Sequence, residues 1–475
     1  MQLKKALWGN LVYTAVQFTL PLITMVFLAN VLGASAFGQL SWVEGFCRLL
    51  GLLFSMGIPL YGPKALMQCG TDEERTAVLN GLLRIHLFIV LLMLGAGMIF
   101  FQGLKWDGFL PWPWIFLLSQ VFQLEWFFQG TQRFDFVIKR SLFVRSAALL
   151  AVCFFVSRPE DVYLGFMILT TVQCVLGVFN VWHLRKEIDF SWKGNVLLPI
   201  RIDKPLVWLA ISGLCITAYT LLDTVILGWY ADTQSVGNYS VSIRITKLPM
   251  IVMGSIISML VLKLIQLTKE GKSRDFEDLL TKSYKLLMLM ILPITVLLLS
   301  MPDHWARLMG GRTFTSAAEI IKIVAWILPF MVVSNVFGFQ LMISLNREKQ
   351  YMNMAFVGLV TALGLYMLLI PNWGSIGAAW ATFFTELVVA MMSVILSYRY
   401  LKSIHVVNFT IQWVLLLLPI YGVIWWMNII TGGADFLFII APLLLLFYCV
   451  VAVYYVLKER WVFNFVFPSI GYGKV

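Results

Sequence analysis

Long apolar runs recur from one end of the chain to the other, and they constrain the fold more than any other feature. The sequence has 475 residues, of which 60% are hydrophobic and only 12% are charged. Turns and charged positions divide it into about fourteen apolar windows, each near the roughly 20 residues that a helix needs to cross a bilayer. This pattern predicts an all-α polytopic membrane protein with about 14 transmembrane helices. The windows cover approximately 6–30, 37–61, 78–101, 109–129, 141–157, 161–183, 206–230, 238–262, 284–301, 317–343, 352–371, 375–398, 411–430 and 435–457.

Basic residues are concentrated in alternate connections, which predicts the orientation of the chain. The connections on one side hold 25 Lys and Arg residues, and those on the other side hold only Lys105, Arg158, Arg307 and Arg312. Because basic loops stay in the cytoplasm, this favours an even number of spans with both termini cytoplasmic, in the inner (cytoplasmic) cell membrane. The net charge of +11 is explained in the same way, so no nucleic-acid partner is predicted.

Other common kinds of site and segment are not indicated. The six cysteines form no Cys-x-x-Cys pair and the four histidines are scattered, so neither a metal site, a disulfide framework nor a cofactor is predicted. A nucleotide-binding P-loop motif is absent from the sequence, so ATP is not expected to be the direct energy source. The first apolar run, Ala6 to Leu32, is longer than the core of a signal peptide and is therefore predicted to be the first membrane helix.

The two halves of the chain resemble each other. At an offset of 199 positions, Ala36–Ser41 aligns with Ser235–Ser240 and Arg48 aligns with Lys247. At an offset of 212, Pro159, Gly165 and Thr170 align with Pro371, Gly377 and Thr382. Six helices separate the copies, so both have one orientation, which predicts two six-helix lobes in a parallel pseudo-repeat. The predicted parts are an N-lobe at 1–184 (helices 1–6), a cytoplasmic amphipathic linker at 185–205, a C-lobe at 206–402 (helices 7–12), and helices 13–14 with a cytoplasmic tail at 403–475.

Arg48 is the most informative charged residue, because it lies near the middle of a predicted span. It is roughly 16 Å from either end of that helix. A charge at this depth costs roughly 2.5–3.5 kcal/mol, so it is expected to face a partner, a cavity or a ligand. Glu44 precedes it by four residues and shares its helical face. Two interpretations follow: an ion pair with Glu44 alone, or an arginine that also reaches a cavity, as its basic counterpart Lys247 favours.

Further charged residues lie inside predicted spans. Arg244 and Lys247 share one face of the eighth helix, so they need a counter-charge, either from Asp223 on the seventh helix or from an anionic ligand. The planar fork of Arg suits a phosphate, whereas Lys acts as a point charge. Glu386, deep in the twelfth helix, either binds a coupling cation or makes an interhelical hydrogen bond. Glu44, Asp223 and Glu386 are therefore the candidates for ion pairing or coupling.

Polar residues also follow one face of the first helix. They either bind a hydroxyl-rich sugar or form hydrogen bonds between helices, and they are Asn10, Tyr13, Thr14 and Gln17. Arg84, Arg145 and Glu125 lie close to the predicted cytoplasmic helix ends. Their side chains are expected to extend toward the lipid headgroups.

Several glycine- and proline-containing segments resemble polysaccharide flippases of the multidrug/oligosaccharidyl-lipid/polysaccharide exporter superfamily. The resemblance covers essentially the whole chain. The segments are Leu32-Gly33, Phe37-Gly38, the exit Gly57-Ile58-Pro59-Leu60-Tyr61-Gly62, Asp223 with Val236-Gly237-Asn238-Tyr239, and Pro371-x-x-Gly374-x-x-Gly377-Ala378-Ala379. In such proteins helices 1, 2, 7 and 8 line a central cavity.

The resemblance implies a transporter rather than an enzyme. Its expected activity is the transfer of a polyprenyl-diphosphate-linked oligosaccharide from the cytoplasmic to the outer leaflet by alternating access. Arg48, Arg244 and Lys247 would then bind the diphosphate, and Asn10, Tyr13, Thr14 and Gln17 the glycan. A coupling proton or sodium ion and a polysaccharide polymerase complex are left open as partners. The alternatives are a cation-coupled multidrug exporter of the same superfamily, whose first-helix Asp is missing here, and a membrane glycan polymerase or ligase.

Overall fold

The computed structural model describes residues 2–55, 71–100, 109–131, 134–185 and 204–401, with isolated positions between 58 and 69 and between 418 and 426. Throughout these residues the regular structure is helical, which confirms the all-α prediction. The elements are α1 (Gln2–Ser55), α3 (Asp72–Phe100), α4 (Trp112–Gln120), α5 (Glu125–Gly130), α6 (Phe134–Phe155), η2 (Pro159–Asp161), α7 (Val162–Leu184), α8 (Lys204–Tyr230), α9 (Thr233–Lys269), α10 (Ser273–Ser300), α11 (Pro302–Gly310), α12 (Ala317–Val324), α13 (Ile327–Val333), the π-helical η3 (Ser334–Gln340), α14 (Leu341–Ser344) and α15 (Glu348–Leu401).

Two very long helices each contain two of the predicted spans. α1 and α15 are both 54 residues long, and each turns sharply at a glycine with positive φ: Gly33 (φ 72°) and Gly374 (φ 53°). Only glycine adopts this conformation without strain, so these two positions separate the spans. Among the described residues, eight segments have the length and composition to cross a membrane. The predicted linker and helices 13–14 lie outside the described residues apart from isolated positions, so the count of fourteen stays a prediction.

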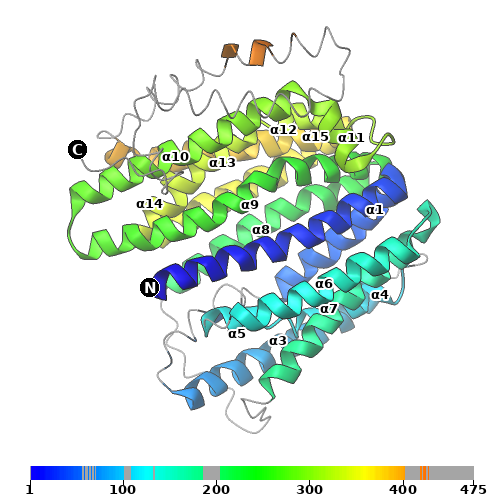
Figure 1. The fold of residues 1–475 in the computed structure, drawn as a ribbon, viewed down its shortest axis with the longest axis horizontal. Helices are drawn as coiled ribbons and strands as arrows, with labels where there is room; N and C mark the ends of the chain where they lie inside the picture. Colours follow the sequence, from blue (N-terminus) through cyan, green and yellow to red (C-terminus); the bar gives the residue numbers. More distant parts are fainter. Residues whose placement is uncertain are drawn as a thin grey trace. The chain divides into compact units, whose positions relative to one another are not determined.

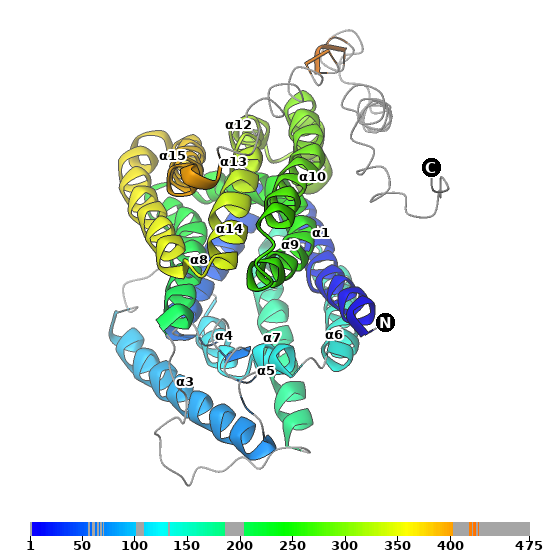
Figure 2. The ribbon, with the colours of Figure 1, turned by 90° about the vertical axis from the view of Figure 1, so that its left-hand side faces the viewer.

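The chain divides by packing into two compact units, which we describe separately. The first contains Met1–Val241, Met309–Thr315 and Asn346–Thr385, and the second contains Ser242–Leu308, Ser316–Leu345 and Glu386–Val475. In the first unit α1 packs along α6, α7 and α8, while α4 packs on α7 (Figures 1 and 2). In the second unit α10 packs on α12, α13 and η3. The predicted division into an N-lobe and a C-lobe stays a prediction.

Two glycines of the first unit make a reciprocal backbone contact. A Cβ on Gly38 of α1 would overlap the carbonyl oxygen of Thr233, and a Cβ on Gly237 of α9 would overlap the carbonyl oxygen of Ala34. Positions 38 and 237, like 34 and 233, are related by the repeat offset of 199. Each copy of the repeat therefore contributes a glycine and a carbonyl from equivalent positions, as expected for segments related by a two-fold axis. This contact agrees with the predicted parallel repeat.

The fourth predicted span, 109–129, is not one continuous helix. The chain breaks between α4 and α5, and a side chain of α7 supplies a hydrogen bond to a main-chain carbonyl of the break: Asn180 Nδ2 donates to the carbonyl of Phe122 (2.9 Å). The side chain of Gln123, also in the break, donates in turn to the carbonyl of Gln173 on α7 (2.8 Å). Such compensation is required where a helix is broken at membrane depth. The break also starts a new helix at Glu125, which is important for the site below.

Candidate functional site

A cavity of about 470 Å³ lies within the first unit, bordered by α1, α4, α5, α6 and α7. Its lining includes apolar residues, among them Phe18, Pro21, Phe116 and Leu169. It also includes polar and charged side chains, which are Gln17, Thr24, Glu44, Arg48, Glu125, Arg145 and Gln173. All lining residues fall within the predicted N-lobe. Because the lining mixes apolar and charged side chains, the cavity could hold a ligand that has both an apolar and a charged part.

Glu44 and Arg48 form the predicted ion pair on the cavity wall. Arg48 donates from Nη2 (2.7 Å) and Nε (3.0 Å) to Oε1 of Glu44. The pair follows from their spacing of four residues on α1. The carboxylate is buried, with 5% of the Glu44 side chain exposed, whereas 51% of the Arg48 side chain is exposed. The two interpretations of the sequence are therefore compatible, because Arg48 both pairs with Glu44 and lines the cavity.

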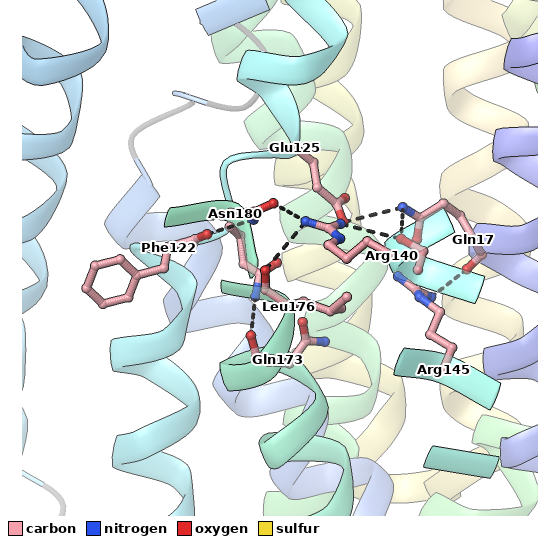
Figure 3. Close-up of polar contacts among 10 residues, drawn as sticks. Gln17, Phe122, Glu125, Arg140, Arg145, Gln173, Leu176 and Asn180 are labelled. Carbon is pink, nitrogen blue, oxygen red and sulfur yellow. Dashed lines mark hydrogen bonds and ion pairs between the residues drawn. The ribbon is translucent and has the colours of Figure 1, made fainter. Parts of the chain in front are cut away.

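A second ion pair joins α5 to α6 (Figure 3), and its carboxylate, Glu125, also lines the cavity. Arg140 Nη2 donates to Oε1 of Glu125 (2.7 Å), and only 1% of the Arg140 side chain is exposed. Its Nη1 contacts the amide oxygen of Asn180 on α7 and the carbonyl oxygen of Leu176. A buried guanidinium requires such neutralisation, since an uncompensated charge in this environment is costly.

Gln17 and Arg145 connect this pair to α1 (Figure 3). Gln17 Nε2 donates to Oε1 of Glu125 (3.3 Å) and to Oγ of Ser141 (3.4 Å). Arg145 Nη1 donates to the main-chain carbonyl of Gln17 (2.7 Å). We call Gln17, Glu125, Arg140, Arg145 and Asn180 the cavity cluster. Its contacts join α5, α6 and α7 to α1, and those of Gln17 span 108 to 128 positions of the sequence.

Two arginines, Arg48 and Arg145, line the cavity together with Glu44 and Glu125. Arg48 pairs with Glu44, Arg145 donates to the main-chain carbonyl of Gln17, and Glu125 pairs with Arg140. Guanidinium groups on a cavity wall suit the oxygens of a phosphate.

The structure differs from the sequence-based interpretation of Arg145, Glu125 and Arg140. The first two were expected to extend toward lipid headgroups, but both line the cavity. Arg140 was counted among the loop residues, but it is a buried member of α6, because α6 begins at Phe134 rather than near 141. The sequence analysis did not use the position of Pro21, four residues after Gln17 on α1, which could have indicated that the Gln17 carbonyl needs another hydrogen-bond donor.

Asp223 belongs to another buried network of the first unit. Its Oδ2 accepts a hydrogen bond from the Tyr239 hydroxyl (2.8 Å), and its Oδ1 accepts one from the Thr224 hydroxyl (3.0 Å). The Tyr239 and Thr382 hydroxyls are 2.8 Å apart, and the Tyr366 hydroxyl donates to the carbonyl of Tyr219 (3.2 Å). We call Asp223, Tyr239, Tyr366 and Thr382 the tyrosine cluster. All four are almost completely buried.

The remaining predicted site residues are not brought together with the cavity by the described contacts. Arg244 and Lys247 are half-buried on α9 and Glu386 is buried on α15, and all three belong to the second unit. The side chains of Asn10, Tyr13 and Thr14 lie outside the described residues. The roles predicted for these residues stay predictions. Among the residues searched, which are the described ones, there is no group of three or more His, Cys, Asp or Glu side chains that could hold a metal ion.

Comparison with known proteins identifies the family. The model of the family described as "Polysaccharide biosynthesis protein" matches residues 3–262, and that of the MatE family matches residues 209–368. A candidate O-antigen transporter of Escherichia coli (strain K12) is 23% identical over 82% of this chain and 96% of its own length. A candidate low-salt glycan biosynthesis flippase, Agl15 of Haloferax volcanii, is 25% identical over 34% of each chain.

Solved structures show the same fold. The lipid II flippase MurJ in an inward closed conformation has a TM-score of 0.66 at 16% identity, covering 93% of this chain and 98% of its own. A multidrug resistance MATE family transporter in an inward-facing conformation also has a TM-score of 0.66, at 11% identity, covering 82% of this chain and 95% of its own. The chain is therefore a member of the polysaccharide biosynthesis protein family, within the superfamily that also contains the MATE transporters.

Proposed function

We propose that this protein is a flippase that moves a polyprenyl-diphosphate-linked oligosaccharide from the cytoplasmic to the outer leaflet, for cell-surface polysaccharide synthesis. The observation that carries the proposal is a cavity whose lining combines two arginines, Arg48 and Arg145, with apolar side chains. The diphosphate would bind at Arg48 and Arg145. The glycan would contact polar residues of α1, among them Gln17.

Transport would follow alternating access, in which the cavity opens to each side of the membrane in turn. Moving negative charge outward across an inside-negative membrane is favourable by about 2.3 kcal/mol per charge per 100 mV. We propose that this potential contributes to the direction of transport. Proton or sodium binding at Glu44 or Glu386 is a further proposal for coupling. Asp223 is left out of it, because hydroxyl groups of the protein already donate to its carboxylate.

In the proposed topology the protein lies in the inner (cytoplasmic) membrane, and both of its termini are in the cytoplasm. Reporter fusions at Lys4 and Lys474 should both read cytoplasmic, and a fusion near Arg307 should read external. A periplasmic C-terminus would overturn the even span count. A complex with a polysaccharide polymerase is also proposed, and co-purification with that enzyme would test it.

The decisive test of function uses a deletion strain. Loss of the protein should cause a lipid-linked oligosaccharide to accumulate in the cytoplasmic leaflet, and the wild-type gene should reverse this. The purified protein, reconstituted in vesicles, should then move the same lipid between leaflets. The alternative, supported by the MATE-like fold, is export of organic cations. Efflux of such cations without movement of the lipid-linked oligosaccharide would favour that alternative.

A further inference from the structure

Pro21, four residues after Gln17 on α1, explains why Arg145 contacts the Gln17 carbonyl. In an α-helix the carbonyl of residue 17 accepts a hydrogen bond from the N–H of residue 21. Residue 21 is Pro21, which lies inside α1 and has no N–H. The carbonyl of Gln17 therefore lacks its helical donor, and Arg145 Nη1 donates to it instead at 2.7 Å. Pro21 and Arg145 also both line the cavity.

This arrangement does more than satisfy a carbonyl. A membrane helix that lacks one backbone hydrogen bond needs a replacement donor, but a hydroxyl or a water molecule could supply it without bringing a charge. Here the donor is a guanidinium, which has five N–H groups, on the wall of a cavity. One of its nitrogens is held by α1, and the contact fixes the position of a long and otherwise flexible side chain.

We propose that Pro21 is a positioning residue for anion binding: by freeing the Gln17 carbonyl it anchors Arg145 at the cavity wall, where the guanidinium binds the phosphate oxygens of the ligand. The inference rests on the proposed function and adds to it the residue that places the anion-binding arginine. Pro21 acts only through Arg145. A proline at this position therefore sets the affinity of the cavity for an anion without contacting the anion itself.

The test compares binding of farnesyl diphosphate, with farnesol as the neutral control, through the thermal stabilisation of the full-length protein in detergent. Pro21→Ala restores the N–H of residue 21, so the Gln17 carbonyl returns to the helix and Arg145 loses its anchor. The concentration of farnesyl diphosphate for half-maximal stabilisation should rise about tenfold, as for the loss of one charge-assisted contact. Pro293→Ala, at another proline inside a helix, is the matched control and should bind like the wild type.

A double-variant cycle distinguishes positioning from a general effect on α1. Arg145→Gln should weaken binding at least as much as Pro21→Ala does, and the combined variant should bind no more weakly than Arg145→Gln alone. If Pro21→Ala weakens binding equally in the Arg145→Gln protein, Pro21 does not act through Arg145 and the inference is wrong. Pro21→Ser restores the same N–H and repeats the test if the alanine variant does not accumulate.

The outcomes separate this inference from the proposed function. Stabilisation of the wild type by farnesyl diphosphate, but not by farnesol, together with unchanged binding by Pro21→Ala, would overturn only the role of Pro21. A wild-type protein that responds equally to both probes, or to neither, would contradict the diphosphate site itself, and the inference would be rejected with it.

Discussion

The cavity cluster and the tyrosine cluster are both buried polar networks of the first unit, but they are built from different chemistry. The cavity cluster contains two arginines and one glutamate, and several of its members border a cavity of about 470 Å³. The tyrosine cluster joins one carboxylate to hydroxyl groups, and its residues are at most 3% exposed. The first network is thus accessible to a ligand, and the second is not.

This difference teaches how to separate binding from architecture in a membrane interior. Buried polar groups are expensive in both places, so burial alone identifies neither. In the tyrosine cluster, hydroxyl donors satisfy Asp223 within the protein, which fixes α8, α9 and α15 relative to one another. In the cavity cluster, the charged side chains of Glu125 and Arg145 border a cavity, where a ligand can reach them. Access from a cavity therefore indicates the candidate binding site.

The largest effect is expected from breaking the buried ion pair of the cavity cluster. Arg140→Gln leaves Glu125 without its main positive partner, and such a loss costs about 3–5 kcal/mol of folding free energy. The amount of folded protein and its melting temperature should both fall. Lys139→Gln is the matched control, because Lys139 is the exposed neighbour on α6 and should have no effect. Equal loss of folded protein in both variants would show that the ion pair of Arg140 has no special structural role.

Arg48 should affect transport more than folding. Arg48→Ala removes an exposed guanidinium from the cavity, so the rate of lipid-linked oligosaccharide transport should fall about 10- to 100-fold. Arg48→Lys should restore it only partly, because lysine lacks the planar fork. A lower protein level in Arg48→Ala would show that the buried Glu44 carboxylate has lost its neutralising partner. The combined Glu44→Ala and Arg48→Ala variant should recover any lost protein but not transport, and recovery of transport would contradict a binding role.

A smaller effect is expected in the tyrosine cluster, and on stability alone. Tyr239→Phe removes the hydroxyl that donates to Asp223, which should lower the free energy of unfolding by about 1–3 kcal/mol. Transport by the remaining folded protein should be unchanged at 25 °C. Tyr163→Phe, at a tyrosine of α7 that is 38% exposed, controls for loss of a hydroxyl as such. A transport defect that exceeds the loss of protein would place the tyrosine cluster in the transport cycle and end the contrast between the clusters.

The smallest expected effect is the energetic coupling between the clusters. They share no residue, and among the described contacts no hydrogen bond joins them. The stability changes of Arg145→Gln and Tyr239→Phe should therefore add within about 0.3–0.5 kcal/mol. Melting curves of the two single variants and the combined variant give this number. A larger coupling would mean that the two networks respond to each other.

The sequence predicted the helices and the local ion pair, but not the long-range contacts. Apolar windows located most of the long described helices because span length is set by the bilayer, although the window 109–129 is divided between α4 and α5. Glu44 and Arg48 were paired correctly, since their spacing decides which residues share a face. In contrast, Gln17 and Glu125 are 108 positions apart, and no periodicity relates them. Arg140 was misplaced because apolar windows do not record the polar first turns of a membrane helix.

The reciprocal contact of Gly38 and Gly237 has a consequence for how this protein can be altered. Its geometry is that of a symmetric homodimer interface, in which each partner offers the same glycine to the same carbonyl. In a true homodimer, any codon change appears on both sides of the axis at once. Here the two halves are encoded separately, so either glycine can be changed while its counterpart is kept. Single substitutions can therefore make the two halves of this chain differ from each other, whereas a substitution in a homodimer changes both subunits.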